Sequence, residues 1–129
     1  MKNRRSLKDP LVYSHILFFL NGLLYMQRQF FLLSSCLFCC TVASFFYHLS
    51  KEKSIFWGRI DRKMCFISVG VIVYHLIQFA DWKHVILCIL WLCLSLFVYK
   101  ISFLSYKLLH SLWHVGVYIG NLFVLLSIS

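Results

Sequence analysis

This sequence contains few charged residues. Only 13% of its 129 residues are charged, and four acidic residues stand against 13 Lys and Arg. A soluble domain has about 25% charged residues, so this composition argues against a soluble globular fold. Proline occurs once and glycine five times, which leaves little room for long loops. With 61% hydrophobic residues, the chain is predicted to be an all-α integral membrane protein.

Long apolar runs divide the chain into candidate membrane spans. A spanning helix needs roughly 17–25 residues, and five runs approach or reach that length. They are residues 10–27, 29–47, 64–80, 85–101 and 104–128. The third and fourth runs are short, so four spans are the alternative to five. Because no domain boundary, repeat or low-complexity tract is visible, we expect residues 1–129 to form a single transmembrane domain.

The placement of the basic residues predicts the orientation of these spans. In a five-span topology, eleven of the 13 Lys and Arg residues fall on one side of the membrane, and only Arg28 and Lys83 fall on the other. Basic residues favour the cytosolic side, so the N-terminus is predicted to be cytosolic and the C-terminus extracytosolic. This asymmetry accounts for the net charge of +9. We therefore expect membrane lipids as partners and no nucleic acid.

Polar side chains inside the apolar runs gather near the cytosolic side. Ionisable groups within a membrane usually face the interior of the helix bundle. In the five-span topology, His48 ends the second span and Asp61 begins the third, both on the cytosolic side. His110 lies about six residues into the fifth span, roughly 9 Å along the helix axis. Counting spans and charges thus predicts one polar layer built from three helices.

The stretch "HSLWH" has the spacing of a metal site. Residues four apart lie on one face of a helix, so His110 and His114 can reach one ion, and His48 can supply a third nitrogen. Three protein ligands with one open position are typical of catalytic zinc. Ser44 lies one turn before His48 on the same face, and Asp61 can hydrogen-bond a zinc-bound water. The simpler explanations are helix packing for the histidine pair and an N-cap for Asp61.

The other histidines and the cysteines have simpler explanations. We interpret His15 and His75 as hydrogen-bonding between helices, and His84 as a solvated loop residue. Cysteine packs like a small hydrophobic residue, and small residues let helices approach closely. We therefore interpret the six cysteines as packing residues. They are Cys36, Cys39, Cys40, Cys65, Cys88 and Cys93.

The polar residues, taken in order, resemble the pattern of a known family. "SFFYH" holds Ser44 and His48 at the end of the second span, "GRIDRK" holds Asp61, and "HSLWH" holds the last two histidines. This pattern resembles the CREST superfamily, which includes alkaline ceramidases, progestin and adipoQ receptors with the hemolysin III proteins, GPI-lipid remodelling proteins and myomaker-like proteins. "FFYHL" and "RID" are similar to the hemolysin III and adipoQ branch, whereas "HSLWHV" is similar to the others. The branch therefore stays open.

The resemblance implies a zinc enzyme. It implies that His48, His110 and His114 bind Zn²⁺, and that Asp61 and Ser44 contact the zinc-bound water or the substrate carbonyl. The implied reaction is hydrolysis of a lipid amide or ester, ceramide-like by analogy, with Asp61 as general base. The family core has seven spans and this chain at most five, so the chain resembles a shortened member. Removing two helices keeps the direction of the last span, so its histidines stay in the predicted layer.

The smaller number of helices leaves other functions open. With two helices fewer the site is less enclosed, and a homo-oligomer is one way to complete a lipid chamber. The alternative to a hydrolase is a non-catalytic membrane protein with a structural zinc site, acting as a receptor, a lipid sensor or in membrane remodelling. The third hypothesis is a bis-histidine haem protein, with His48 and one histidine of the last span as axial ligands.

Overall fold

The computed structural model describes residues 5–100 and 105–128, and every regular element in those two ranges is a helix. The helices are α1 (Pro10–Tyr13), α2 (Ile16–Gln27), α3 (Phe31–Leu49), α4 (Ile55–Phe79), α5 (Trp82–Lys100) and α6 (Tyr106–Ile128). The predicted all-α class is confirmed. The predicted end of the fourth span at residue 101 and start of the fifth at residue 104 lie outside the described residues.

The first predicted span is divided into two helices. Asp9 caps α1 by accepting a hydrogen bond from the Leu11 N–H at 3.1 Å, and Pro10 occupies the first helical position, as is favourable at a helix start. After one turn the helix is interrupted at Ser14 and His15, and α2 begins at the next residue. Both interrupting side chains are buried, so the break turns them toward the bundle interior.

The third predicted span begins too late, because α4 starts at residue 55 and not at 64. Ser54 provides the N-cap by accepting a hydrogen bond from the Trp57 N–H at 3.2 Å. The prediction followed the apolar run alone and excluded the polar first turns of the helix. Asp61 therefore lies within α4, and the alternative that it caps this helix is wrong.

Two helices have the length and composition of a membrane span. They are α3 and α6, and α5 contains a shorter apolar stretch, Trp82–Val98. α4 is longer than either, but its first turns carry charged side chains, including Arg59, Asp61 and Arg62. Length and composition thus support two of the five predicted spans.

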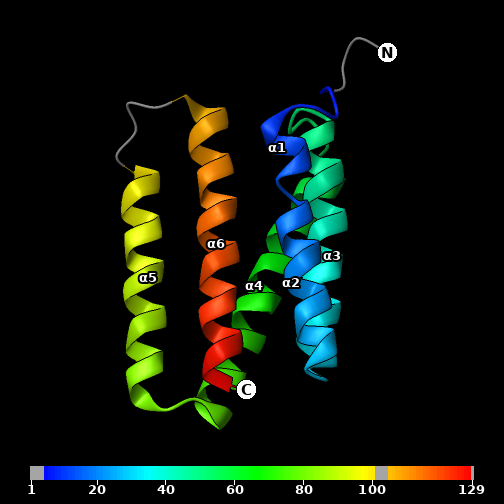
Figure 1. The fold of residues 1–129 in the computed structure, drawn as a ribbon. Helices are drawn as coiled ribbons and strands as arrows, with labels where there is room; N and C mark the ends of the chain where they lie inside the picture. Colours follow the sequence, from blue (N-terminus) through cyan, green and yellow to red (C-terminus); the bar gives the residue numbers. More distant parts are fainter. Residues whose placement is uncertain (1–4, 101–104, 129) are drawn as a thin grey trace.

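The helices run alternately up and down along one common direction (Figure 1). α3 packs against α2 and α4, while α6 packs against α5 on one side and against α1, α2 and α4 on the other. Figure 1 accordingly shows α6 between α5 and the rest of the bundle. α1 and the C-terminal end of α6 lie at opposite ends of the molecule.

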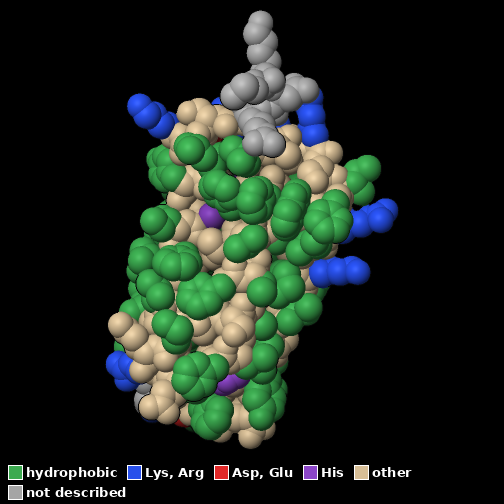
Figure 2. Space-filling model, turned by 90° about the vertical axis from the view of Figure 1, so that its right-hand side faces the viewer, with side chains coloured by type: hydrophobic (Ala, Val, Ile, Leu, Met, Phe, Trp, Pro, Cys, Tyr) green, Lys and Arg blue, Asp and Glu red, His purple; other side chains and the backbone are tan. Residues whose placement is uncertain are grey.

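The surface is apolar and the interior contains many polar groups. Hydrophobic side chains cover most of the face formed by α2 and α3, and basic side chains stand at its edges (Figure 2). α4 and α5 also expose large apolar residues, such as Phe66 and Ile77. The buried polar residues are Ser14, His15, Asn21, Ser34, Ser44, His48, Ser68, His75, His114 and Asn121. An apolar surface over an interior that also holds these polar groups suits a hydrocarbon environment.

Candidate metal centre

Three buried histidines meet at the α1 end of the bundle. His15 lies at the break before α2, His48 in the last turn of α3 and His114 in the first half of α6. Each is at most 2% exposed, and one ring nitrogen of each lies within 4.8 Å of those of the other two. Two nitrogen ligands of a tetrahedral zinc ion are roughly 3.4 Å apart. These three side chains could therefore hold a metal ion after small side-chain movements.

His110 lies beside this group. Its ring centroid is 4.8 Å from those of both His48 and His114. Within the described residues, however, the converging ring nitrogens belong to His15, His48 and His114. The sequence pattern had assigned the third position to His110 and left His15 out. The structure thus brings four imidazoles into one cluster, with His15 inside the converging set.

His15 is the most informative member of the cluster. Both of its ring nitrogens are buried, and neither has a hydrogen-bond partner among the described residues. The predicted hydrogen bond between helices is therefore wrong for His15, and His75 instead bonds the Val71 carbonyl within its own helix at 2.8 Å. An unmade hydrogen bond on a buried polar group costs about 1–3 kcal/mol. A bound metal ion would satisfy a nitrogen that the described chain leaves without a partner.

A carboxylate orients the ring of His48. Glu52 Oε1 lies 2.6 Å from His48 Nδ1, and the Arg5 guanidinium donates to the other carboxylate oxygen at 2.6 Å. The turn that delivers Glu52 is strained, because Lys51 and Glu52 have φ angles of 56° and 58°, values that non-glycine residues seldom adopt. With Nδ1 engaged, Nε2 of His48 is the nitrogen left for an ion. Metal-ligating histidines commonly have such a carboxylate partner.

Ser14 orients the ring of His114 in the same way. The Ser14 hydroxyl oxygen lies 2.6 Å from His114 Nδ1, a buried contact between residues 100 positions apart in the chain. The interruption between α1 and α2 directs this hydroxyl inward. Nε2 of His114 is then also the nitrogen left for an ion. Two members of the cluster are thus held by a polar partner, and His15 is the third, without one.

Charged side chains join the segments that carry the cluster. The Lys107 ammonium donates to the Asp9 carboxylate at 2.9 Å, and the Arg5 guanidinium lies 3.8 Å from the same carboxylate. Burial raises the pKa of the Asp9 carboxyl, but the hydrogen bonds from Lys107 and from the Leu11 N–H outweigh it, so this pKa lies below its ordinary value. Through Arg5 and Glu52, the network links α1, α3 and α6.

The two predicted catalytic residues lie on α3 and α4. Ser44 is buried one turn before His48, on the same face of α3 as predicted. Asp61 is half-buried, and its Oδ1 is buried without a hydrogen-bond partner among the described residues. The charge of Asp61 acts on the thiols of Cys40 and Cys65. Asp61 is therefore near enough to these thiols for its charge to act on them.

Three residues of the site escaped the sequence-based prediction. His15 had a usable signal: it lies five residues after Pro10, roughly 7.5 Å along the predicted span, and therefore in the layer predicted for His110. Glu52 had none, because its position depends on the strained turn. Ser14 had none either, because an apolar run gives no sign of where its helix will be interrupted.

Comparison of the chain with protein-family models, with curated proteins and with solved structures found no match. The likeness to the CREST superfamily therefore depends on the motif residues alone.

Proposed function

We propose that this protein is an integral membrane protein that binds zinc through His15, His48 and His114 and uses the ion to hydrolyse a lipid amide or ester. The observation that carries the proposal is the position of His15. A buried imidazole without a hydrogen-bond partner among the described residues offers a ring nitrogen within 4.8 Å of one nitrogen each of His48 and His114. His110 is the alternative third ligand, as the sequence pattern predicts.

The set of donor atoms fits zinc. Neutral imidazole nitrogens are zinc ligands, and three protein ligands leave one coordination position open for a water or substrate. When bound, zinc supplies polarisation of a carbonyl group and a lowered pKa for water. The ring centroid of His48 lies only 4.8 Å from that of His110 and 5.8 Å from that of His114. These short separations favour a single ion over a haem macrocycle inserted between the histidines.

The reaction divides among residues of this chain. Glu52 and Ser14 hold His48 and His114 with Nε2 toward the ion. Asp61 accepts the proton of the attacking water and returns it to the departing amine or alcohol as the carbonyl–nitrogen or carbonyl–oxygen bond breaks. Ser44 donates a hydrogen bond to the carbonyl oxygen as it becomes negative. The burial of Ser44 one turn from His48 and the buried Asp61 oxygen without a partner in the described chain support these roles.

The proposal includes five spans with a cytosolic N-terminus. Two apolar helices of sufficient length, the apolar surface and the alternating helix directions support it. A glycosylation acceptor appended after Ser129 should be modified, whereas one placed before Met1 should not. The reverse pattern would move the histidine layer to the extracytosolic side and contradict the proposed topology.

Metal analysis of detergent-purified protein tests the zinc site directly. We expect about one zinc ion per chain, lost when His48 and His114 are both replaced by Ala. The matched control is His84→Ala, which removes an exposed histidine at the other end of the bundle. Full zinc retention in the double variant would show that the cluster is a packing arrangement and not a ligand set.

A non-catalytic zinc clamp is the second candidate function. The observation that favours it is His110, whose position gives the cluster a fourth imidazole, since four protein ligands are typical of structural zinc. Release of fatty acid from a panel of ceramides and acyl esters by purified, zinc-loaded protein separates the two functions, because only the hydrolase forms product.

A further inference from the structure

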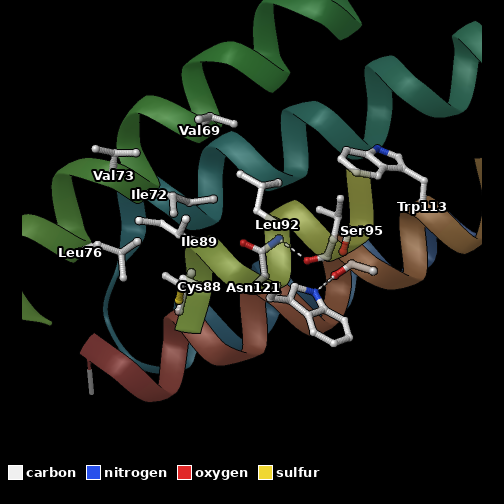
Figure 3. A pocket seen from close by; sticks show the side chains of 15 residues that line it. Val69, Ile72, Val73, Leu76, Cys88, Ile89, Leu92, Ser95, Trp113 and Asn121 are labelled. Atoms are coloured by element: carbon white, nitrogen blue, oxygen red, sulfur yellow. Dashed lines mark hydrogen bonds between the residues drawn. The ribbon is translucent and has the colours of Figure 1, made fainter. Parts of the chain in front are cut away.

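A groove of about 230 Å³ lies where α4, α5 and α6 meet, at a distance along α6 from the histidines. It exists because α5 packs chiefly on α6 and makes few contacts with α4. Figure 3 shows its wall, which consists mainly of Val, Ile, Leu and Trp side chains from the three helices. No charged side chain is among the described residues that line it.

Asn121 and Ser95 are the polar amide and hydroxyl residues of this wall, and Asn121 is the buried one. It is 4% exposed, and its amide nitrogen donates to the Val117 carbonyl at 3.0 Å. Its side-chain oxygen is buried and has no hydrogen-bond partner among the described residues. Exchanging the amide nitrogen and oxygen would set two acceptors against each other, so the orientation is fixed. Figure 3 shows the oxygen turned away from this carbonyl, toward the side on which Ile72 and Ile89 lie.

Neighbouring polar groups do not satisfy this oxygen. The Trp91 indole N–H already donates to the Gly116 carbonyl at 2.7 Å, and the Tyr25 hydroxyl donates to the backbone oxygen of Asn121 at 2.7 Å. Asn121 lies seven residues before Ile128, roughly 10 Å along the axis, and therefore below the polar surface of a membrane. A buried water normally has about three hydrogen-bond partners, more than this largely apolar wall offers. A hydrogen-bond donor on another molecule would therefore satisfy the side-chain oxygen of Asn121.

The mouth of the groove opens on the exposed apolar surface. Val69 and Val73 on α4 and Leu92 on α5 line the groove and are each about half exposed. A molecule that enters between these helices comes sideways from the hydrocarbon of the bilayer. Such a molecule has an alkyl chain that matches the wall. Because the lining is uncharged, its hydrogen-bond donor is neutral, and an ammonium group would be buried without a counter-charge.

We propose that this groove binds an alkyl-chain lipid whose hydroxyl or amide N–H donates a hydrogen bond to the side-chain oxygen of Asn121. The inference rests on the membrane placement proposed above and is independent of the zinc site, since none of the cluster histidines lines the groove. The alkyl chain fills the space between α4 and α5, and the donor completes the pairing of the Asn121 amide.

A matched pair of probes tests the proposal. Tritiated hexadecan-1-ol has the alkyl chain and the donor, whereas hexadecyl methyl ether has the chain without the donor. Purified wild-type protein in detergent should bind hexadecan-1-ol about tenfold more tightly than the ether, the factor expected when a buried acceptor loses its partner. In Asn121→Leu, this preference should disappear. Zinc content is measured on the same samples, so failure of the groove and failure of the metal site remain distinguishable.

A second variant protects the test against a folding failure of Asn121→Leu. Val73 is exposed, so Val73→Trp should fold, fill the groove from the α4 side and abolish binding of hexadecan-1-ol while zinc is retained. Three results overturn the proposal: no saturable binding to the wild type, equal binding of both probes, or a preference that persists in Asn121→Leu. A detergent-stable dimer that buries the groove and excludes hexadecan-1-ol also overturns it, because the occupant would then be a second copy of the chain.

Discussion

α3 and α5 are both 19-residue apolar helices, yet the bundle uses them in opposite ways. α3 buries eight side chains, whereas none of the described side chains of α5 is buried. The difference lies in where small and polar residues occur. On α3, the residues Cys36, Cys40, Ser44 and His48 repeat every four positions and form one face, while α5 is covered by large aliphatic side chains. Hydrophobicity makes a helix suitable for a membrane, and the small polar face decides which helix builds the interior.

The comparison extends to how each region satisfies its polar groups. Around α3, the chain supplies partners: Glu52 in the turn after α3 pairs with His48, and Ser68 on α4 pairs with Cys40. Near α5, the Asn121 oxygen faces a groove with no partner from the described chain. We propose that the first region holds an ion and that the second admits a lipid. The predictions below separate these two regions.

The largest expected effect is the loss of zinc from the α3 region when His15 is replaced by Ala. Loss of a residue that only hydrogen-bonds to a metal ligand lowers metal affinity roughly 10–100-fold. His15 is proposed as a ligand itself, so its replacement should lower zinc affinity by more than this. His110→Ala should cost less, because its nitrogens are outside the converging set. Competition with a zinc-binding dye measures both, and His75→Ala is the control for loss of a buried histidine. If His110→Ala abolished binding and His15→Ala did not, the set predicted from the sequence would be the right one.

The next effect is on catalysis. Asp61→Asn should keep zinc and fold but lose roughly 100-fold or more in turnover, the scale of general-base catalysis, because an amide cannot accept the proton. Turnover of the lipid substrate found in the ceramide and ester panel is the measurement. Asp81→Asn, which alters an exposed carboxylate beside α5, is the matched control. Near-normal turnover by zinc-loaded Asp61→Asn protein would remove Asp61 from the mechanism and favour the structural zinc clamp.

A third prediction concerns the support of His48. Glu52→Gln keeps an oxygen near Nδ1 but removes the negative charge that strengthens the ligand. We expect zinc affinity to fall about 10–100-fold, the usual loss for such a partner, with unchanged zinc stoichiometry at saturation. Titration of the metal-free protein gives the affinity, and circular dichroism checks the fold. Unchanged affinity would mean that Glu52 serves only to pair with Arg5 at the end of α3.

How much of this could be predicted from the sequence differs between the two regions. Periodicity alone placed Ser44 on the same face as His48 and His114 one turn after His110, since both depend on the helix repeat. Counting spans and basic residues predicted that His48 and the histidines of the last span lie on one side of the membrane. The position of Glu52 could not be predicted, because two consecutive non-glycine residues with positive φ are stabilised only by contacts that exist after folding.

The helix boundaries and the groove between α4, α5 and α6 could not be predicted from the sequence for other physical reasons. The start of α4 is set by the Ser54 cap and lies in a polar stretch, whereas the prediction followed hydrophobicity. The groove exists because α5 packs on α6 and makes few contacts with α4. The sequence of α5 is apolar on all sides, so it does not indicate which neighbouring helix α5 will contact. His15 was missed because it has no second histidine one turn away. Its distance from the start of the first span nevertheless matched the polar layer predicted for His110.

Hydrogen exchange of the detergent-solubilised protein should sharpen the comparison of α3 with α5. Local opening requires less free energy where fewer side chains are buried. The backbone amides of α5 should therefore exchange faster than those in the second half of α3. Saturating hexadecan-1-ol should slow exchange in α5 and leave α3 unchanged. Equal protection of both helices without lipid would contradict the picture of α5 as a loosely held helix.

The smallest expected effect is on the charged network that joins α1 to α6. Asp9→Asn keeps a good N-cap but removes the charge that pairs with Lys107. The pKa of the Asp9 carboxyl in the folded protein lies below the ordinary value of 3.8. The ionised carboxylate therefore stabilises the fold above pH 3.8, and this contribution is lost as the pH falls through the lower, folded-state pKa.

Above pH 3.8 the variant should thus be less stable than the wild type, by less than about 1 kcal/mol, as is typical for a pair at the surface. The difference should shrink in more acidic buffer, because the wild type then loses the same charge. Thermal unfolding at pH 6 and at pH 3, followed by near-UV circular dichroism, measures it. Asp81→Asn is the corresponding variant beside α5. The hydrogen bond from the His84 N–H lowers the pKa of the Asp81 carboxyl too. The stability difference between this variant and the wild type should therefore also shrink as the pH falls. A difference for Asp9→Asn that did not shrink between pH 6 and pH 3 would show that hydrogen-bond geometry, and not charge, joins α1 to α6.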